Sequence, residues 1–394
     1  MAKSQRVLWR QVCGLAAVQG AIALTWVIYN LYLVELLTQQ GFPKPLAATL
    51  LIIENILGAL MEPLMGSLSD QTQHWMGSRF PQVALGMILA AIAFMAIPIV
   101  AIGGGAALRQ VLPVVLVAWA LAMTVFRSPA LSLLGRYAFE SDLPQAAAVL
   151  TLVGGAAGAM APLANQFILS LGAGTVFAIG SGVLLVAAGV LQKMNPNRSL
   201  HSKITSQPAI EAKPLSWINL SLVFGVGMTT ALGFRLVLQM VPSLLKTQIQ
   251  PSMVTLITGL IFITLVVAAL PCGALAVRLG NRQGMGLGLA ILVMTCGLML
   301  VVQNSVQAIL LAIALGIGLT LLSNGTLPYA LSMVPPSKGG LGTGTYFSGG
   351  AVALSLLGTA TQRGLLSPTG GLLISMASFA IAALLLSAKP LSHG

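Results

Sequence analysis

The amino-acid sequence predicts an all-α membrane protein in which twelve transmembrane helices form two pseudo-symmetric six-helix bundles. The 394-residue chain is 57% apolar and only 7% charged, whereas soluble domains carry about 25% charged residues. Its apolar runs are each about as long as the ~20 residues that a helix needs to cross a bilayer. Motifs also recur at matching places in the two halves. These observations exclude a disordered chain and a disulfide scaffold, and they argue strongly against a soluble enzyme.

Apolar runs bounded by glycine, proline and charged residues mark the expected spans. The first run continues through polar and aromatic residues to about Leu37 without a small-residue cleavage site, so we interpret it as a membrane helix and not as a signal peptide. The polar stretch 194–214 is a central cytoplasmic loop that separates an N-terminal bundle, 1–193, from a C-terminal bundle, 215–394. The expected spans are 11–38, 46–68, 82–103, 111–135, 145–171, 174–193, 215–245, 252–277, 284–302, 306–333, 342–366 and 369–388.

Basic residues account for the net charge of +12 and set the expected orientation. With the N-terminus inside, thirteen of the 19 Lys and Arg residues fall on cytoplasmic segments, four on outer edges, and two, Arg127 and Arg235, inside spans. Because Lys and Arg accumulate in cytoplasmic loops, we expect both termini in the cytoplasm of a multi-pass protein of the bacterial inner membrane. No basic run alternates with aromatic residues, so nucleic acid is not an expected partner.

Two pairs of motifs indicate an internal duplication. The second expected span ends with Pro63 and the following apolar residues, and the eighth ends in the same way with Pro271. Pro129 and Pro328 stand at matching places in the fourth and tenth spans, and each is followed by a polar turn and a Gly-Gly pair. Duplicated six-span halves are a known transporter architecture, with the binding site between the halves near mid-membrane.

The segment after the second span carries a family resemblance. Gly66–Asp70 reads GSLSD and Gly77–Pro81 reads GSRFP. This pattern resembles the loop 2–3 signature of the major facilitator superfamily, and its longer spacing and ending look like the sugar:cation symporter branch (glycoside–pentoside–hexuronide and sucrose-type carriers). The stretch from Phe126–Pro129 to Gly154-Gly155 looks like the fourth-to-fifth span region of that branch.

The resemblance implies the major facilitator fold, alternating access by rocking of the two bundles, and a cytoplasmic latch. In that latch Asp70 and Arg79 would hold the start of the eleventh span, where Gly342 and neighbouring glycines allow close approach, and would favour the outward-open state. A helix N-terminus attracts a carboxylate. Ordinary capping of a tight loop is the alternative. The equivalent second-half loop, Ala276–Arg282, has no acidic residue.

Charged residues inside spans are the first candidates for function, because each costs about 2.5–3.5 kcal/mol on insertion scales. Glu54 and Glu62 share one broad face of the second span, and Arg127 lies deep in the fourth. We expect Arg127 to pair with one of the two, because removing one partner of a buried ion pair is strongly destabilising. Either the pair breaks and re-forms as substrate or proton binds, or it holds the N-terminal bundle together. No Asp or Glu follows Glu211, so a coupling carboxylate must lie in the N-terminal half.

Arg235 lies in the seventh span and has no acidic neighbour in its own half. An intramembrane guanidinium of this kind is a candidate ligand for a carboxylate or a phosphate. The alternatives are an ion pair with Glu35 across the two halves, or snorkelling of the side chain to water.

Polar residues inside spans are candidate cavity residues. Gln19, Trp26 and Asn30 fall within about 40° on a helical wheel of the first span, and Trp26 is suited to stacking on a sugar or an apolar ligand. Asn324 and Tyr346 are further candidates. Hydrogen bonding between helices is the alternative for this group.

No nucleotide-binding loop, HExxH motif or CxxC pair occurs in the sequence, and no histidine lies at membrane depth. We therefore expect no enzyme activity, no catalytic residue, no cofactor and no metal. We interpret the chain as a monomeric secondary transporter that moves a small solute, such as a sugar or an organic anion, with protons coupled through Glu54 or Glu62. An uncoupled facilitator or amphiphile exporter is one alternative, and a non-transporting assembly factor for a membrane complex is another.

Overall fold

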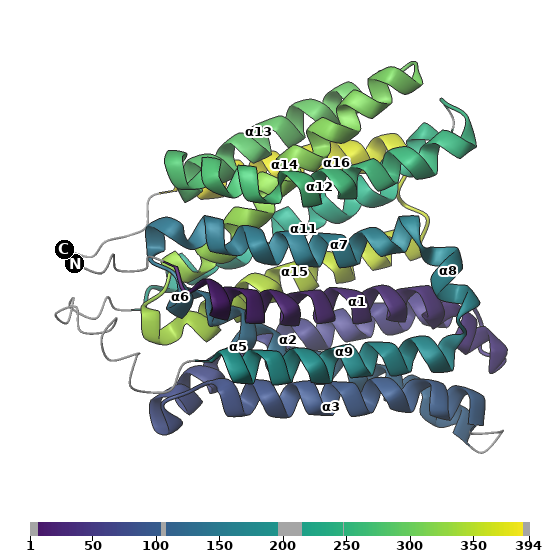
Figure 1. The fold of residues 1–394 in the computed structure, drawn as a ribbon. Helices are drawn as coiled ribbons and strands as arrows, with labels where there is room; N and C mark the ends of the chain where they lie inside the picture. Colours follow the sequence, from purple (N-terminus) through teal and green to yellow (C-terminus); the bar gives the residue numbers. More distant parts are fainter. Residues whose placement is uncertain (1–6, 104–107, 196–214, 247, 389–394) are drawn as a thin grey trace.

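The computed structural model describes residues 7–103, 108–195, 215–246 and 248–388, and these ranges are almost entirely helical. The long helices run side by side in a bundle, as Figure 1 shows. The prediction of an all-α membrane fold is confirmed. Most of the expected central loop, 194–214, lies outside the described residues.

The first half of the chain begins with two helices of more than 30 residues, and its later helices are shorter. Its helices are α1 (Trp9–Gln39), α2 (Pro45–Met76), α3 (Phe80–Pro98), η1 (Ile99–Gly103), η2 (Arg109–Val111), α5 (Leu112–Ser132), α6 (Leu134–Tyr137), η3 (Glu140–Asp142), α7 (Leu143–Leu163), α8 (Asn165–Ser170) and α9 (Ala173–Met194).

The described part of the second half consists of six long helices and one short 3₁₀ turn. Its helices are α11 (Trp217–Leu245), α12 (Pro251–Leu279), α13 (Asn281–Met299), α14 (Ser305–Ser332), η4 (Pro336–Lys338), α15 (Gly339–Gln362) and α16 (Pro368–Ser387). We call the end of the bundle where α1 starts and α2 stops the near end, and the opposite end, where α1 stops and α2 starts, the far end.

Eleven helices among the described residues are long and apolar enough to cross a membrane. The helix in the position of the expected eleventh span, α15, is the exception, because its 24 residues are rich in glycine, serine and threonine. It packs between α2 and α11, so small side chains that permit close approach replace the apolar bulk that lipid-facing helices need.

Two boundaries differ from the sequence prediction. The helix α2 continues eight residues beyond the expected span end at 68 and stops at Gly77, whose φ of 71° is the left-handed conformation that favours glycine. The expected span 145–171 is divided at Ala164, which leaves helical geometry with φ −125° and ψ 13°. Pro162 lies just before this break and removes one backbone donor from the helix.

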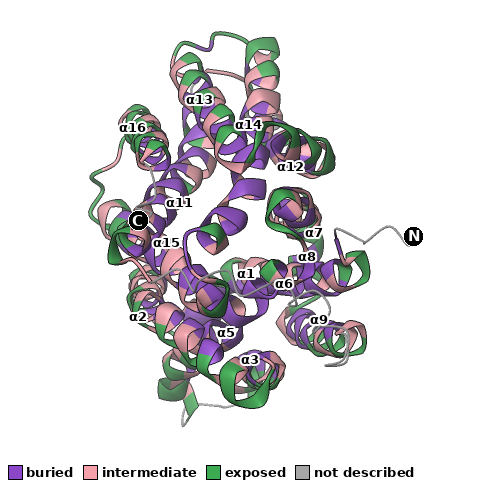
Figure 2. Ribbon diagram, turned by 90° about the vertical axis from the view of Figure 1, so that its left-hand side faces the viewer, coloured by how far each residue is buried: buried purple, intermediate pink, exposed green. Residues whose placement is uncertain are grey.

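Each half has its own apolar core. One cluster is built from the N-terminal half, around Trp119, Phe94 and Phe177, with Leu327 as its contribution from α14. The other lies wholly in the C-terminal half, around Phe379. Figure 2 shows buried residues on the faces where helices meet and exposed residues around the outside. Many exposed side chains are large and apolar, as a lipid-facing surface requires.

The two halves meet mainly along two helix pairs, α2 with α15 and α7 with α12. The approach of α2 and α15 is close enough that a Cβ on Gly66 would overlap the backbone of Gly340. At the near end Leu331 of α14 also packs against the N-terminal core, beside Gly135 of α6. The halves are therefore joined at the near end by α2, α15, α6 and α14.

Candidate functional site

Two adjoining cavities lie inside the bundle. The first, of about 340 Å³, is lined by α11, α14 and α15 of the C-terminal half. The second, of about 360 Å³, is lined by α1, α5 and α7 of one half and by α11, α12, α14 and α15 of the other. Both cavities share four lining residues, and we call the two together the central site. The shared residues are Phe234, Ser323, Thr326 and Tyr346.

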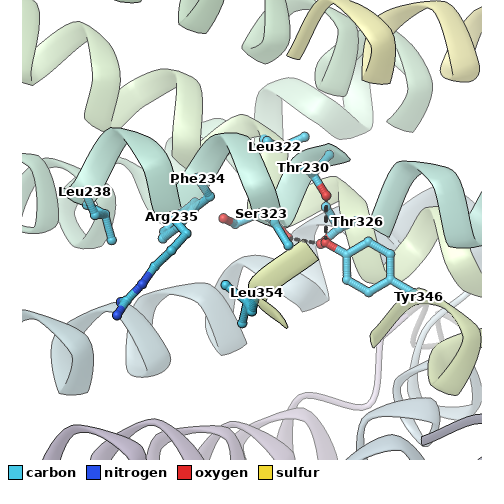
Figure 3. A pocket seen from close by; sticks show the side chains of 10 residues that line it. Thr230, Phe234, Arg235, Leu238, Leu322, Ser323, Thr326, Tyr346 and Leu354 are labelled. Carbon is cyan, nitrogen blue, oxygen red and sulfur yellow. Dashed lines mark hydrogen bonds between the residues drawn. The ribbon is translucent and has the colours of Figure 1, made fainter. Parts of the chain in front are cut away.

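Hydroxyl groups gather at the wall that the two cavities share. The Tyr346 hydroxyl lies 3.3 Å from the Thr230 hydroxyl and also hydrogen-bonds the Thr326 side chain, as Figure 3 shows. Gln19 of α1 lines the second cavity from the opposite half, and its buried Oε1 has no hydrogen-bond partner in the part of the chain that the structure describes. The polar groups of the central site therefore come from both halves.

Arg235 lines the first cavity from α11 and extends away from the Tyr346 hydroxyl (Figure 3). Within the described residues its guanidinium has no ion pair or hydrogen bond. The alternative partner Glu35 instead accepts a hydrogen bond of 2.9 Å from Gln39 on its own helix, near the far end. The cross-half pair between Arg235 and Glu35 is therefore not formed.

An ion pair joins α2 and α5 beside the central site. Arg127 Nε donates to Glu62 Oε1 over 2.7 Å, and the second guanidinium nitrogen lies 2.5 Å from the same oxygen. The Ser128 hydroxyl donates to the other carboxylate oxygen. The side chain of Glu62 is 0% exposed and that of Arg127 is 22% exposed. The Arg127 guanidinium lies 4.6 Å from the ring centroid of Phe347, which lines the second cavity, so the pair is one side chain away from the site.

Glu54 has a different environment. Its carboxylate accepts a hydrogen bond from the Tyr29 hydroxyl, and its second oxygen is buried and has no partner within the described ranges. Tyr29 packs against Trp119 with ring centroids 4.4 Å apart, and Trp26 lies 4.8 Å from the same indole. No cation pairs with Glu54 among the described residues, and Glu54 lines neither cavity of the central site.

Three of the polar residues expected in the cavity lie outside it. Asn30 is exposed and its amide donates to the Trp26 carbonyl over 2.7 Å. Asn324 is fully buried and its amide donates to the Ala269 carbonyl of α12 over 2.8 Å. Trp26 is held in the aromatic cluster with Trp119. In each case a hydrogen bond or ring contact within the protein holds the side chain, and none of the three lines either cavity of the central site, whereas Gln19 and Tyr346 do.

Several residues of the central site were missed by sequence analysis. Ser323 lies one residue before Asn324 on α14, and Thr326 lies two residues after it. Because each residue adds about 100° of helical rotation, Ser323 and Thr326 lie on the face that meets the cavity, whereas Asn324 lies on another face. Phe234 precedes Arg235 and lines both cavities. In the sequence, the one indication of these residues is that they lie close to the candidates Arg235 and Asn324.

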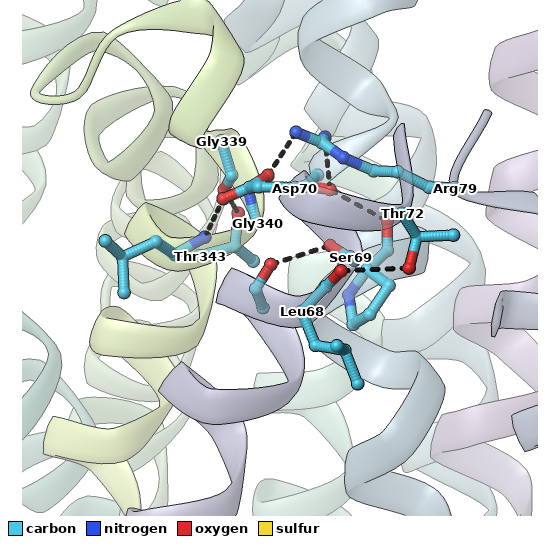
Figure 4. A network of polar contacts seen from close by, with 12 residues as sticks. Leu68, Ser69, Asp70, Thr72, Arg79, Gly339, Gly340 and Thr343 are labelled. Atoms are coloured by element: carbon cyan, nitrogen blue, oxygen red, sulfur yellow. Dashed lines mark hydrogen bonds and ion pairs between the residues drawn. The ribbon is translucent and has the colours of Figure 1, made fainter. Parts of the chain in front are cut away.

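A buried polar network joins the two halves at the near end (Figure 4). Asp70 accepts hydrogen bonds of 2.9 Å from the backbone N–H groups of Gly340 and Leu341, at the start of α15. Arg79 forms an ion pair with Asp70 and donates to the Ser132 hydroxyl over 2.7 Å. Burial lowers the pKa of the Arg79 guanidinium from its usual value, and the Asp70 charge opposes that fall.

Two details of this network differ from the sequence prediction. Asp70 lies on the last turns of α2 and not in a loop after it. Gly342 does not face Asp70, because it is two residues beyond Gly340 and therefore on another face of α15, where it packs against Ala330 of α14 and Val334 in the segment that follows α14. Gly340 and Gly344 are the glycines that meet α2.

Among the residues that the structure describes, no three His, Cys, Asp or Glu side chains lie close enough together to hold a metal ion. The polar groups of the central site are hydroxyls, an amide and a guanidinium, which can bind a solute by hydrogen bonds and charge.

Comparison with known proteins identifies the fold. Scans of the sequence against protein family models and against curated proteins find no match. Solved structures match over nearly the whole chain. The human organic anion transporter MFSD10 (TETRAN) is 15% identical with a TM-score of 0.71, and the match covers 96% of this chain and 99% of that one. A bacterial homologue of the iron transporter ferroportin, in an outward-facing state, is 19% identical with a TM-score of 0.72, covering 97% and 98%.

A third structure is the Escherichia coli fucose:proton symporter FucP, which is 12% identical with a TM-score of 0.69, covering 97% and 98%. FucP is described as a major facilitator superfamily transporter. At these identities the likeness is one of fold, so the chain is a multi-pass membrane protein with the major facilitator fold. The three proteins differ in their solutes, and the likeness does not single out the sugar:cation symporter branch.

Proposed function

We propose that the protein is a secondary transporter that moves a small solute by alternating access between its two halves. One observation carries this proposal: the second cavity is lined jointly by both halves, with Gln19 on one side and Phe234 and Tyr346 on the other. A cavity built this way changes shape when the halves rock against each other. The solved structures of similar fold support the proposal, because their names describe a fucose:proton symporter, an organic anion transporter and a homologue of an iron transporter.

The near-end network is the proposed latch. Asp70 holds the first turn of α15 through two backbone donors, and Arg79 holds Asp70. The two hydrogen bonds from Gly340 and Leu341 to Asp70 cross between the halves, so the near end can open only if they break. We propose that they favour the state in which the central site is closed at the near end, which we place on the cytoplasmic side of a bacterial inner membrane with both termini cytoplasmic.

Proton coupling is proposed for Glu62, with Arg127 as its counter-ion. Protonation of Glu62 would remove the charge that holds Arg127, whose guanidinium rests on Phe347 at the wall of the second cavity. Solute contact with Phe347 and proton binding at Glu62 would then both affect the position of the Arg127 guanidinium. Glu54 is the second candidate, because it lies in the same helix and lacks a cationic partner among the described residues.

The test is solute flux by the purified protein in proteoliposomes. A thermal-shift screen with a solute library selects candidates, and the flux of each hit is measured with and without an imposed pH gradient. Flux that follows the gradient supports the coupled carrier, and flux that ignores it favours the uncoupled facilitator or exporter. Copurification with a membrane complex and no flux of any hit would replace the transporter proposal with the assembly factor. Size-exclusion chromatography with light scattering tests the proposed monomer.

A further inference from the structure

The charge in the central site is one-sided. Arg235 lines the first cavity, and neither cavity is lined by an aspartate or a glutamate. The whole sequence from residue 212 to the C-terminus contains no acidic residue. Glu62, which is linked to the site through Arg127 and Phe347, is already neutralised by that arginine. An anion that enters the central site therefore meets a cation that no carboxylate of the described residues compensates.

The surroundings of Arg235 are mostly apolar. Leu238 of the same helix and Leu354 of α15 line the first cavity together with Arg235 (Figure 3). Phe234 lies between the first and the second cavity. The hydroxyls of Thr230 and Tyr346 are bonded to each other at the other side of the cavity. An occupant thus meets a guanidinium at one side, apolar side chains along its length and hydroxyls at the other.

Arg235 is suited to an oxyanion. A guanidinium presents planar donors that match a carboxylate or a sulfonate with two parallel hydrogen bonds, and such charge-assisted bonds are stronger than neutral ones. A neutral polyol would leave the guanidinium charge uncompensated, and an organic cation would be repelled by it.

We propose that the central site binds an amphiphilic organic anion, with its carboxylate or sulfonate on Arg235 and its apolar body against Phe234, Leu238 and Leu354. The inference rests on the proposed transport function and adds the chemical class of the solute.

The experiment measures equilibrium binding to the full-length protein in phosphatidylcholine nanodiscs. The probes are a panel of arylalkyl and alkyl carboxylates and sulfonates, such as 4-phenylbutanoate, each paired with its neutral amide and with the ammonium of matching length. We expect the anions to bind about ten- to a hundredfold more tightly than their amides, as the strength of charge-assisted hydrogen bonds implies. Arg235→Gln removes this preference, and Arg235→Lys retains part of it.

Arg363→Gln is the matched control, because it also removes one arginine charge but at an exposed position after α15 that lines neither cavity. It should keep the preference for anions. Equal affinity for anions and amides, or an unchanged preference in Arg235→Gln, would overturn the inference.

The same preparation separates this inference from the transport proposal. If only neutral or cationic solutes bind and cross proteoliposomes, the anion inference fails while the transporter stands. If no solute of the panel or the library binds or crosses, both fail together.

Discussion

At the scale of single residues, Glu62 and Arg127 form the ion pair on which the proposed proton coupling depends. The carboxylate is completely buried and receives donors from both Arg127 and Ser128. A buried ion pair of this kind is weak evidence for stability, since apolar replacement is often neutral, whereas removal of one partner leaves a costly lone charge. The two roles of the pair, coupling and structural, therefore predict different results for single and double substitutions.

Glu62→Gln should abolish the dependence of flux on the pH gradient, because the amide cannot release or take up a proton in this range. It also leaves Arg127 unpaired, which we expect to cost about 3–5 kcal/mol of stability. The double variant Glu62→Gln/Arg127→Gln replaces the charges with a neutral pair and should recover most of that stability without recovering coupling. Thermal unfolding and proteoliposome flux are the two measurements. A double variant that still followed the pH gradient would show that the pair is structural only.

Tyr29 and Glu54 give a second residue-scale prediction. Tyr29→Phe removes the donor to a buried carboxylate that has no other partner among the described residues, so it should destabilise the protein by about 1–3 kcal/mol. Glu54→Gln keeps an acceptor for the Tyr29 hydroxyl and should cost much less. Melting temperatures of both variants in the same detergent test this order. The reverse order would mean that the hydroxyl does not hold Glu54.

Sequence reasoning reached some of these residues and not others, for physical reasons. The pairing of Arg127 with a second-span glutamate follows from the cost of an isolated charge in hydrocarbon. The choice of Glu62 over Glu54, and the contact of Glu54 with Tyr29, depend on how α1, α2 and α5 are rotated about their axes. A helical wheel shows which residues share a face, but it does not show which neighbouring helix that face meets. For the same reason it could not show that Asn324 faces α12.

At the scale of elements, the contact between α2 and α15 is one of the closest helix contacts among the described residues. Gly340 meets the backbone of Gly66 and lies beside Asp70, so a methyl group at Gly340 would force the helices apart. This contact also explains why the most apolar stretch of α15 is less apolar than those of the other long helices, because its surface packs against neighbouring helices and not against lipid. Sequence hydropathy found the length of the other spans well, but the extension of α2 to Met76 and the break at Ala164 depend on packing and on Pro162.

Gly340→Ala should open the near end. We expect the added methyl group to displace the start of α15 and so weaken the two hydrogen bonds to Asp70. Spin labels at the exposed His74 of α2 and Ser337 of η4, with the exposed Cys13 replaced by serine, report the separation across the halves. The distance distribution should shift to longer values.

Gly286→Ala on α13 is the control for that substitution, because a Cβ there meets nothing within 4 Å. It should leave the distances unchanged and slightly stabilise the helix, since alanine is the better helix former. Unchanged distances in Gly340→Ala as well would mean that the glycine contact does not hold the near end closed.

At the scale of the whole molecule, the two halves each have an apolar core of their own, and the central site lies between them. Relative motion of the halves then changes the contacts between them, chiefly those of α2 with α15 and of α7 with α12 and those of α14 with the N-terminal half, while most of each core stays packed. The near end has a charged network across these contacts, whereas the far end has the weaker hydrogen bond of 3.1 Å between Gln362 and Thr49. This asymmetry predicts that the far end opens more readily.

A tether across the far end should therefore stop transport. In a Cys13→Ser background, Thr49→Cys and Gln362→Cys place two thiols on opposite halves, where the native side chains touch. A short bis-methanethiosulfonate crosslinker should abolish flux, because the far end can no longer open, and reduction should restore it. The control pair Gln239→Cys/Thr361→Cys lies at the same end but within the C-terminal half, where the native side chains are 3.4 Å apart. Crosslinking that pair leaves the halves free to move, so flux should persist; equal loss of flux in both pairs, or undiminished flux with the cross-half tether, would contradict rocking of two rigid halves.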